Sequence, residues 1–436
     1  MAPATHKSPA GYFELVRSNR NFRYLWFGQI VSLLGDWFNL IASASLIALL
    51  TGSGVAVGSL FVVRMLAPFL VSPFAGVAAD RYNRKWLLIL ADLGRAVTVL
   101  GFLFVRRPEQ IWLLYTLTAI QLGISGFFFP SRNAILPDLV SRPELGAANA
   151  LSSATWSVML AFGAALGGIV AGEWGIYPSF IIDAVTFLAS AVLIGQIAYD
   201  FRRERDGEDD SVGAALREYF DGLRYLRRHV DYFVITLHKP AFALLVSGTF
   251  QVVQVTLAEQ IFVYGEGGST GLGLLYAAVG VGTGLGPIIA RRFTGDRGRA
   301  LRVAIVVGYG VSAAGLALVA TLSSFGVVLV GTFLRGFGNG IGWVFSTQLL
   351  LQLLPDRVRG RVFSTEFAML TLMNAAGAAT GGWALDNLEI ATILQAMAGL
   401  LLIPGLLWAL WLVFRPDPEQ MSLAESTPEE VPHPPG

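Results

Sequence analysis

Apolar residues in this chain come in near-continuous runs rather than in the alternating or helical periodicity of a soluble core. The stretches 111–129 and 393–412 are two examples. A run of 18 or more residues with few charges is long enough to cross a bilayer as a helix. A window of about 19 residues predicts twelve such helices: 22–50, 55–79, 86–105, 110–131, 146–171, 176–198, 241–264, 270–290, 301–321, 325–349, 361–385 and 392–414.

The composition supports a membrane protein and excludes several classes of function. Hydrophobic residues make up 54% of the chain and charged residues only 14%, against about 25% charged in a typical soluble domain. The net charge of +1 gives no sign of a nucleic-acid partner. The absence of cysteine and the four scattered histidines argue against thiol chemistry and metal binding. We therefore expect neither an enzyme nor a cofactor.

The basic residues predict the orientation in the membrane. Of the 31 Lys and Arg residues, Arg106 and Arg107 fall in an outer loop, and Arg64, Arg95 and Arg335 fall inside spans. All the others fall on the side of the termini, and cytoplasmic loops carry such an excess. The first twenty residues lack the apolar core of a cleaved signal peptide. We expect a multi-pass protein of the cytoplasmic cell membrane, with both termini cytoplasmic.

These boundaries divide the chain into five parts. We expect a cytoplasmic N-terminus (1–21), a six-helix bundle (22–198), a cytoplasmic linker (199–240), a second six-helix bundle (241–414) and a disordered tail (415–436). In the linker, Leu216, Phe220, Leu223 and Leu226 recur at helical spacing among arginines, which predicts an amphipathic helix. Its simplest role is to tether the two halves, with a regulatory role as the alternative.

The two halves contain matching motifs. Gly163-Ala-Ala-Leu-Gly167-Gly168 recurs as Gly377-Ala-Ala-Thr-Gly381-Gly382, and Leu-Pro-Asp at 136–138 recurs at 354–356. Small residues let helices approach closely in a membrane, so both glycine motifs are expected to pack helices. Two parallel repeats joined by a central loop are typical of alternating-access transporters, with the substrate site between them near the midplane.

The loop between the second and third predicted helices resembles a signature of the major facilitator superfamily. It reads Gly76-Val-Ala-Ala-Asp80-Arg81-Tyr-Asn-Arg84-Lys85, against the pattern Gly-x-x-x-Asp-Arg-x-x-Arg-Lys. The resemblance covers about residues 20–415 and implies an all-helical fold of twelve transmembrane helices in two six-helix bundles. It also implies that Asp80, Arg81 and Arg84 latch the cytoplasmic ends of the bundles together in the outward-open state. The alternative is that the basic residues only set the topology.

Further motifs resemble the exporter branches of that superfamily. Residues 163–168 are similar to its antiporter signature, Gly-Pro-x-x-Gly-Gly, except that Ala164 replaces proline. The segments 35–37, 130–137 and 359–362 resemble macrolide-type drug exporters and the enterobactin exporter. Residues 147–150 are shared with a lysophospholipid-flipping branch. None of these likenesses identifies the substrate.

Charged residues inside the spans are functional candidates because a charge at the bilayer centre costs at least about 2.5–3.5 kcal/mol. Asp36 lies near the midplane of the first span and either carries the coupled proton or pairs with Arg64. Glu259, near the outer end of the seventh span, is a second proton candidate or a wetted rim carboxylate. Arg335 needs a partner across the bundle or on the substrate.

Other charges are expected to form structural pairs. Asp92 and Arg95 are three residues apart on one helix, so they face one another. Asp183 and Glu366 are also expected to pair, the latter with nearby cytoplasmic arginines.

Aromatic and amide residues at depth, among them Trp156, Asn339 and Trp343, could line a pocket for a bulky, partly apolar ligand. No Lys follows Gly, so no phosphate-binding loop for an ATP motor is present. We therefore predict a secondary transporter that acts as a monomer in contact with membrane lipid and exports an amphipathic drug or metabolite in exchange for protons. The alternatives are a lysophospholipid flippase of the same fold and a transport-dead receptor or scaffold.

Overall fold

The computed structural model describes residues 11–199 and 212–414. Most of the expected N-terminal segment, part of the expected linker and the expected tail from residue 415 lie outside the described residues. Throughout the described ranges the chain is helical, because in a lipid core a helix satisfies every backbone hydrogen bond within its own segment.

The first half consists of one short helix and seven longer ones joined by tight connections, with a π-helical turn between α6 and α7 and 3-10 turns between α4 and α5. The elements are α1 (Tyr12–Ser18), α2 (Arg20–Thr51), α3 (Gly54–Arg81), α4 (Arg84–Leu100), η1 (Gly101–Phe104), η2 (Pro108–Gln110), α5 (Ile111–Leu139), α6 (Leu145–Val158), η3 (Met159–Gly163), α7 (Ala164–Glu173) and α8 (Ile176–Gly195).

The second half begins with the linker helix α9 and continues through a helical run that two π-helical turns interrupt. The elements are α9 (Val212–Arg228), α10 (Val230–Thr236), α11 (His238–Phe242), η4 (Ala243–Ser247), α12 (Gly248–Thr256), η5 (Leu257–Ile261), η6 (Glu266–Gly268), α13 (Ser269–Thr294), α14 (Gly298–Val319), α15 (Phe325–Leu353), α16 (Asp356–Asn387) and α17 (Ile390–Phe414). The helical segment of the seventh span runs from Val230 to Ile261. It therefore starts upstream of residue 241, where the sequence predicts this span to begin.

Within the described residues, eleven helical segments are long and apolar enough to cross a membrane. The twelfth is α16, which has the required length but a more polar composition. Its Thr365, Glu366 and Thr371 are buried inside the protein, and the helix packs against α3 and α12. Polar side chains are tolerated in a spanning helix when they face the bundle interior. The predicted all-helical fold of twelve spans in two bundles is confirmed.

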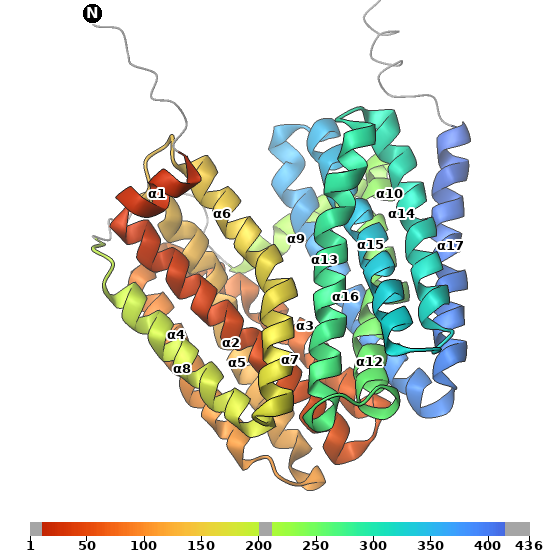
Figure 1. The fold of residues 1–436 in the computed structure, drawn as a ribbon. Coiled ribbons are helices and arrows are strands. Elements are labelled where there is room, and N and C mark those ends of the chain that lie inside the picture. Colours follow the sequence, from red (N-terminus) through yellow and green to blue (C-terminus); the bar gives the residue numbers. More distant parts are fainter. Residues whose placement is uncertain (1–10, 200–211, 415–436) are drawn as a thin grey trace, which may run out of the picture.

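The two bundles lean against each other at one end and diverge at the other (Figure 1). The diverging end carries α1 and the last turn of α17, and we call it the terminal end; the opposite end is the distal end. Helices α7 and α13 pack together across the bundles, and so do α3 and α16. These two helix pairs join the halves.

Polar contacts reinforce the junction near the distal end. The Asp386 carboxylate at the end of α16 accepts hydrogen bonds from the Ser53 hydroxyl (2.9 Å) and from the backbone N–H groups of Gly54 (2.5 Å) and Val55 (3.1 Å). These groups start α3, so Asp386 caps a helix of the other bundle. Between α13 and α2, the Ser269 hydroxyl lies 3.0 Å from that of Ser45.

The two glycine motifs occupy matching positions at this junction. The last glycine of each motif meets the other bundle: Gly168 lies against Gly273 of α13, and Gly382 lies against Gly54 of α3. In both places, a methyl group would come within 3.0 Å of backbone atoms of the opposite helix. The motif repeat therefore corresponds to a repeated contact between bundles.

The other motif glycines pack within their own bundle. Gly163 and Gly167 lie against Trp37 and Phe38 of α2. Gly377 and Gly381 lie against the segment that runs from η4 into α12. Each motif thus holds one helix close to a partner in its own bundle and to a partner in the other bundle.

The linker helix α9 packs on α16 and also touches α3. Its Gly222 is buried against the Arg361 carbonyl and the Thr365 side chain, which leaves no room for a larger residue. Leu226 is buried, whereas Phe220 is exposed. The described part of the linker helix is therefore seated on the second bundle, close to its junction with the first.

Candidate substrate cavity and buried charges

A cavity of about 390 Å³ lies between the two bundles. Its wall combines aromatic and aliphatic side chains with a few polar groups, as in sites for small organic molecules. Both halves contribute: the lining residues are Leu33, Asp36, Trp37, Leu40, Arg64, Met65, Leu122, Ser125, Phe129, Trp156, Met159, Leu160, Ser247, Phe250, Gln251, Gln254, Tyr276, Val279, Arg335 and Asn339.

Most of the residues singled out from the sequence lie on this wall. Asp36, Arg64 and Trp156 line it from the first half, and Arg335 and Asn339 line it from the second. Two of the π-helical turns, η3 and η4, also contribute wall residues, and such turns are frequent at functional sites.

Two predicted residues lie elsewhere. Trp343 is one turn beyond Asn339 on α15 and packs instead near Lys239, whose Nζ lies 5.2 Å from the ring centroid. Glu259 lies in η5, half-buried and outside the set of residues that line the cavity. Trp343 lies on the same face of α15 as Asn339 but about 6 Å further along the helix axis, where it lines a smaller space beside Lys239 and His238.

Asp36 belongs to a buried charge cluster formed by the first bundle. Its Oδ2 lies 3.6 Å from Nη1 of Arg95 on α4, so the expected ion pair with Arg64 is replaced by one with Arg95. Arg95 also donates hydrogen bonds to the Asp92 carboxylate and to the Ser32 hydroxyl. The predicted Asp92–Arg95 pair is therefore present, but it extends to Asp36 through the shared guanidinium.

Aromatic rings hold the Arg95 guanidinium from both sides. Its central carbon lies 4.6 Å from the ring centroid of Phe128 and 4.2 Å from that of Phe187. Such cation–π contacts stabilise a buried cation. No local sequence pattern predicts these contacts, because the two rings come from α5 and α8.

Asp183 on α8 is the third carboxylate of the cluster. It is fully buried and lies against the backbone at Gly35, next to Asp36. Among the described residues, no hydrogen-bond partner reaches its Oδ2. Arg64 on α3 lies within electrostatic reach of both Asp36 and Asp183. The cluster thus joins Asp36, Asp92 and Asp183 with Arg64 and Arg95, so it contains one more carboxylate than guanidinium groups.

Arg335 stands on the opposite wall without a counter-charge. Its side chain is buried, and its guanidinium carbon lies 4.2 Å from the ring centroid of Phe250. No described carboxylate lies within ion-pair distance, and its Nε has no hydrogen-bond partner among the described residues. The predicted partner across the bundle is therefore not found in this conformation.

A second buried ion pair lies in the second bundle. Lys239 Nζ is 2.8 Å from Oε2 of Glu366, and both side chains are almost completely buried. The expected pairing of Glu366 with the cytoplasmic arginines is wrong, because Glu366 points from α16 toward α11. Sequence reasoning missed this pair since Lys239 falls in the predicted linker; its position beside an apolar run was the available signal.

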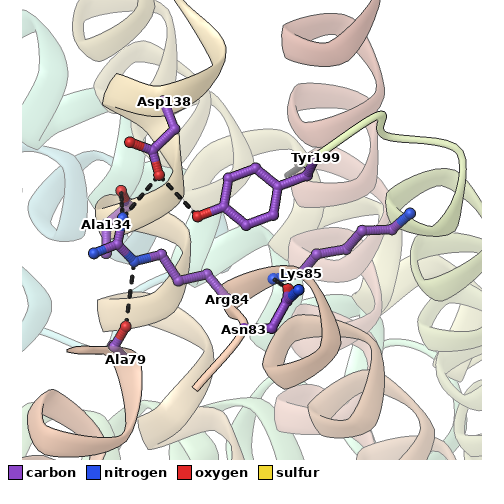
Figure 2. A network of polar contacts seen from close by, with 7 residues as sticks. All are labelled: Ala79, Asn83, Arg84, Lys85, Ala134, Asp138 and Tyr199. Atoms are coloured by element: carbon purple, nitrogen blue, oxygen red, sulfur yellow. Dashed lines mark hydrogen bonds and ion pairs between the residues drawn. The ribbon is translucent and has the colours of Figure 1, made fainter. Parts of the chain in front are cut away.

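A polar network ties the end of α3 to α4, α5 and the segment after α8 at the terminal end (Figure 2). Arg84 donates to the carbonyl groups of Ala79 (3.2 Å) and Ala134 (3.1 Å), and forms an ion pair with Asp138 at 2.8 Å. The Tyr199 hydroxyl donates to the same carboxylate at 2.8 Å. Burial, together with this hydrogen bond, raises the pKa of Tyr199 to about 12.

These contacts all lie within the first bundle, whereas the latch expected from the family signature would cross to the second. Arg81 ends α3 and is exposed, and a side chain at Gly76 would meet open space. The Asp80 side chain lies outside the described residues. The bundles diverge at this end (Figure 1), so a contact that joins them belongs to a different conformation.

Known proteins share both the sequence pattern and the fold. The family model described as Major Facilitator Superfamily matches residues 25–363 and 261–434. An uncharacterized MFS-type transporter of Bacillus subtilis is 27% identical over 90% of this chain and 93% of its own length. A putative bacilysin exporter of Bacillus amyloliquefaciens is 25% identical over 88% and 93%. A multidrug resistance protein of Proteus mirabilis is 26% identical over 82% and 85%.

Solved structures show the same architecture at low identity. A peptide transporter in complex with alafosfalin superposes with a TM-score of 0.71 at 12% identity, covering 93% of this chain and 96% of that one. A nucleoside transporter superposes with a TM-score of 0.67 at 13% identity, covering 90% and 100%. Two bundles with a cavity between them, the signature loop and the family match agree, and the chain is a transporter that belongs to the major facilitator superfamily.

Proposed function

We propose that this transporter exports an amphipathic small molecule across the cytoplasmic membrane in exchange for protons. The excess of basic residues at the terminal end supports a cytoplasmic location for that end. Because the bundles meet near the distal end, the described conformation exchanges ligand with the terminal end, that is, with the cytoplasm. Two relatives, a putative bacilysin exporter and a multidrug resistance protein, support an outward direction of transport.

The position of Asp36 is the observation that carries proton coupling. Its side chain is 23% exposed and lines the cavity, whereas Asp92 and Asp183 in the same cluster are fully buried. A proton from the cavity can therefore reach Asp36. The cluster has one surplus carboxylate, so one bound proton makes it neutral and removes the cost of an unbalanced buried charge.

Protonation also changes the contacts that Asp36 makes. The ionised carboxylate attracts Arg95 across 3.6 Å, and the neutral acid loses this attraction. Helices α2 and α4 are thereby coupled to the protonation state of the cavity. A transporter that opens alternately to two sides can then take up the proton from one side and release it to the other.

In this proposal, the signature loop (residues 76–85) stabilises the other conformation of the transport cycle, which is closed at the terminal end. When the bundles close at the terminal end, Asp80 and Arg81 would contact the second bundle and hold that state. The network around Arg84 fixes the start of α4 beside the end of α3, so it keeps the loop in place for this contact. The protein acts as a monomer in this mechanism, since one chain encloses the cavity.

The test is transport in inverted membrane vesicles with an imposed pH gradient, using a panel of amphipathic compounds. Asp36→Asn preserves the size of the side chain but cannot titrate. It should abolish gradient-driven accumulation while substrate-for-substrate exchange continues at saturating substrate, and Asp36→Glu should retain part of the activity. Asp221→Asn, which changes a carboxylate on α9 whose side chain is 41% exposed, is the control and should transport normally.

Unchanged gradient dependence in Asp36→Asn would show that the proton binds elsewhere, and Glu259 would be the next residue to change. Loss of both accumulation and exchange in Asp36→Asn, with normal folding, would point to a role in substrate binding alone.

A further inference from the structure

The two walls of the cavity carry opposite surplus charges. On the first bundle, the cluster that ends in Asp36 has one carboxylate in excess. On the second bundle, Arg335 is buried without a described counter-ion. A buried, unpaired guanidinium is costly, and the face of Phe250 offsets only part of that cost. Arg335 lines a ligand-sized cavity, so an anionic group bound there would supply the missing counter-charge.

Tyr276 lies between these two charged regions. It lines the cavity from α13 and packs edge-on against Trp37 of the first bundle, with ring centroids 5.4 Å apart. Arg64 of the first bundle and Arg335 of the second line the same cavity as Tyr276. Polar groups from both bundles therefore share this cavity with apolar wall residues such as Leu33, Met65 and Val279.

We propose that the cavity recognises a zwitterion with an apolar body: its carboxylate binds Arg335, and its ammonium group binds at Asp36. This assignment rests on the proposed transport function and gives its substrate class. An arginine binds a carboxylate through charge-assisted hydrogen bonds, which would give Arg335 the counter-charge that it lacks among the described residues. The ammonium would balance the surplus carboxylate of the Asp36 cluster.

This arrangement provides a physical reason for exchange of substrate against protons. An ammonium group at Asp36 adds the same charge as a proton, so the two compete for one carboxylate. The groups that face Asp36 are Arg95 and Asp92 on α4, Arg64 on α3 and Asp183 on α8. When all five groups are ionised they carry one negative charge in excess, and this state accepts one positive charge from either source but not two.

The experiment is equilibrium binding to the purified full chain in lipid nanodiscs, without any gradient. The probes are two zwitterions of different charge spacing, phenylalanine and leucyl-phenylalanine. Each is compared with its N-acetyl form, its amide and its doubly blocked form. We expect at least one zwitterion to bind about tenfold more tightly than either singly blocked form, because each block removes one charge-assisted contact.

Two cavity variants assign the ends of the ligand. Arg335→Gln should remove the preference for a free carboxylate and leave the preference for a free amine, while Arg335→Lys should retain part of the former. Removing an unpaired buried cation leaves no orphaned counter-ion, so Arg335→Gln should fold. Asp36→Asn should remove the preference for a free amine. Arg299→Gln, an exposed arginine outside the cavity, should change neither.

Equal affinity for zwitterionic and doubly blocked probes, or no binding of either zwitterion, would overturn this inference. So would unchanged preferences in Arg335→Gln. None of these results would affect proton-coupled export of another amphipathic molecule, which the vesicle experiment tests separately. Conversely, zwitterion binding with no effect of a pH gradient on transport would retain the ligand class and reject proton coupling.

Discussion

Gly168 of α7 and Gly273 of α13 touch across the bundle interface with their backbones. A Cβ on Gly168 would lie 2.7 Å from the Cα of Gly273, and a Cβ on Gly273 would lie 2.7 Å from the Cα of Gly168. Neither glycine needs an unusual backbone conformation here, so the requirement is for space alone. Close backbone contact between small residues is a main source of helix association in membranes.

Gly168→Ala should therefore weaken the described conformation, in which α7 and α13 are in contact. The added methyl group forces the helices apart, which favours the conformation open at the distal end. Ser45→Cys and Ser269→Cys give a reporter, because the two hydroxyl oxygens are 3.0 Å apart and the chain contains no cysteine. Oxidative cross-linking of this pair should slow severalfold in the Gly168→Ala background.

Gly284→Ala is the matched control. Gly284 lies on α13, the helix that Gly168 contacts, but a methyl group at position 284 would meet open space. Its cross-linking rate should equal that of the parent pair. Equal rates in the Gly168→Ala background would show that this glycine contact does not limit closure.

Asp386→Ala should also loosen the distal junction. The carboxylate accepts hydrogen bonds from three groups at the start of α3. Because the site is exposed, we expect these bonds together to stabilise the distal junction by only about 1 kcal/mol. Fluorescence or spin labels on α3 and α16 should report a larger population of the distal-open state. Glu389→Ala, an exposed acid just beyond α16, should leave the distances unchanged, and a matching effect of both changes would contradict the capping role.

The sequence was sufficient to predict the elements and the repeated contacts, but not the partners of buried charges. Long apolar runs specify spanning helices because the bilayer leaves few alternatives, and the glycine motifs marked sites of close helix approach. The Asp92–Arg95 pair followed from helix spacing. These features depend on local sequence.

Partners on different helices depend on how the bundle packs. Depth alone suggested Arg64 for Asp36, yet Arg95 lies nearer because α4 brings it alongside α2. Lys239 and Glu366 are 127 residues apart in sequence, and no local pattern relates them. Arg335, Asn339 and Trp343 share one face of α15, and the extent of the cavity along the helix axis decides that only the first two line it.

Arg95→Met should destabilise the protein strongly. Arg95 forms ion pairs with both Asp92 and Asp36. Breaking a buried ion pair by removing one partner lowers the free energy of unfolding by about 3–5 kcal/mol. Thermal unfolding in detergent should show a large loss of stability, part of which Asp92→Asn should restore in the double variant.

Arg224→Met is the matched control for Arg95→Met. It breaks an exposed pair with Asp221 that has the same three-residue spacing, and such pairs contribute at most about 1 kcal/mol. A loss of stability of similar size in both variants would show that burial of the Arg95 cluster does not matter.

Tyr199→Phe should cost little stability, with a defined dependence on pH. The pKa of Tyr199 is raised to about 12 in the folded protein, against about 10 for a free tyrosine. The hydroxyl therefore stabilises the fold while it is protonated and donates to Asp138. This contribution is fully present below pH 10 and is lost as the pH rises through 12. We expect this half-exposed hydrogen bond to contribute about 0.5–1 kcal/mol to the free energy of unfolding.

The difference in unfolding midpoint between the parent and Tyr199→Phe should stay constant from pH 6 to 9 and shrink above pH 10. A difference that already falls between pH 7 and 9 would mean that another group controls the network at Arg84.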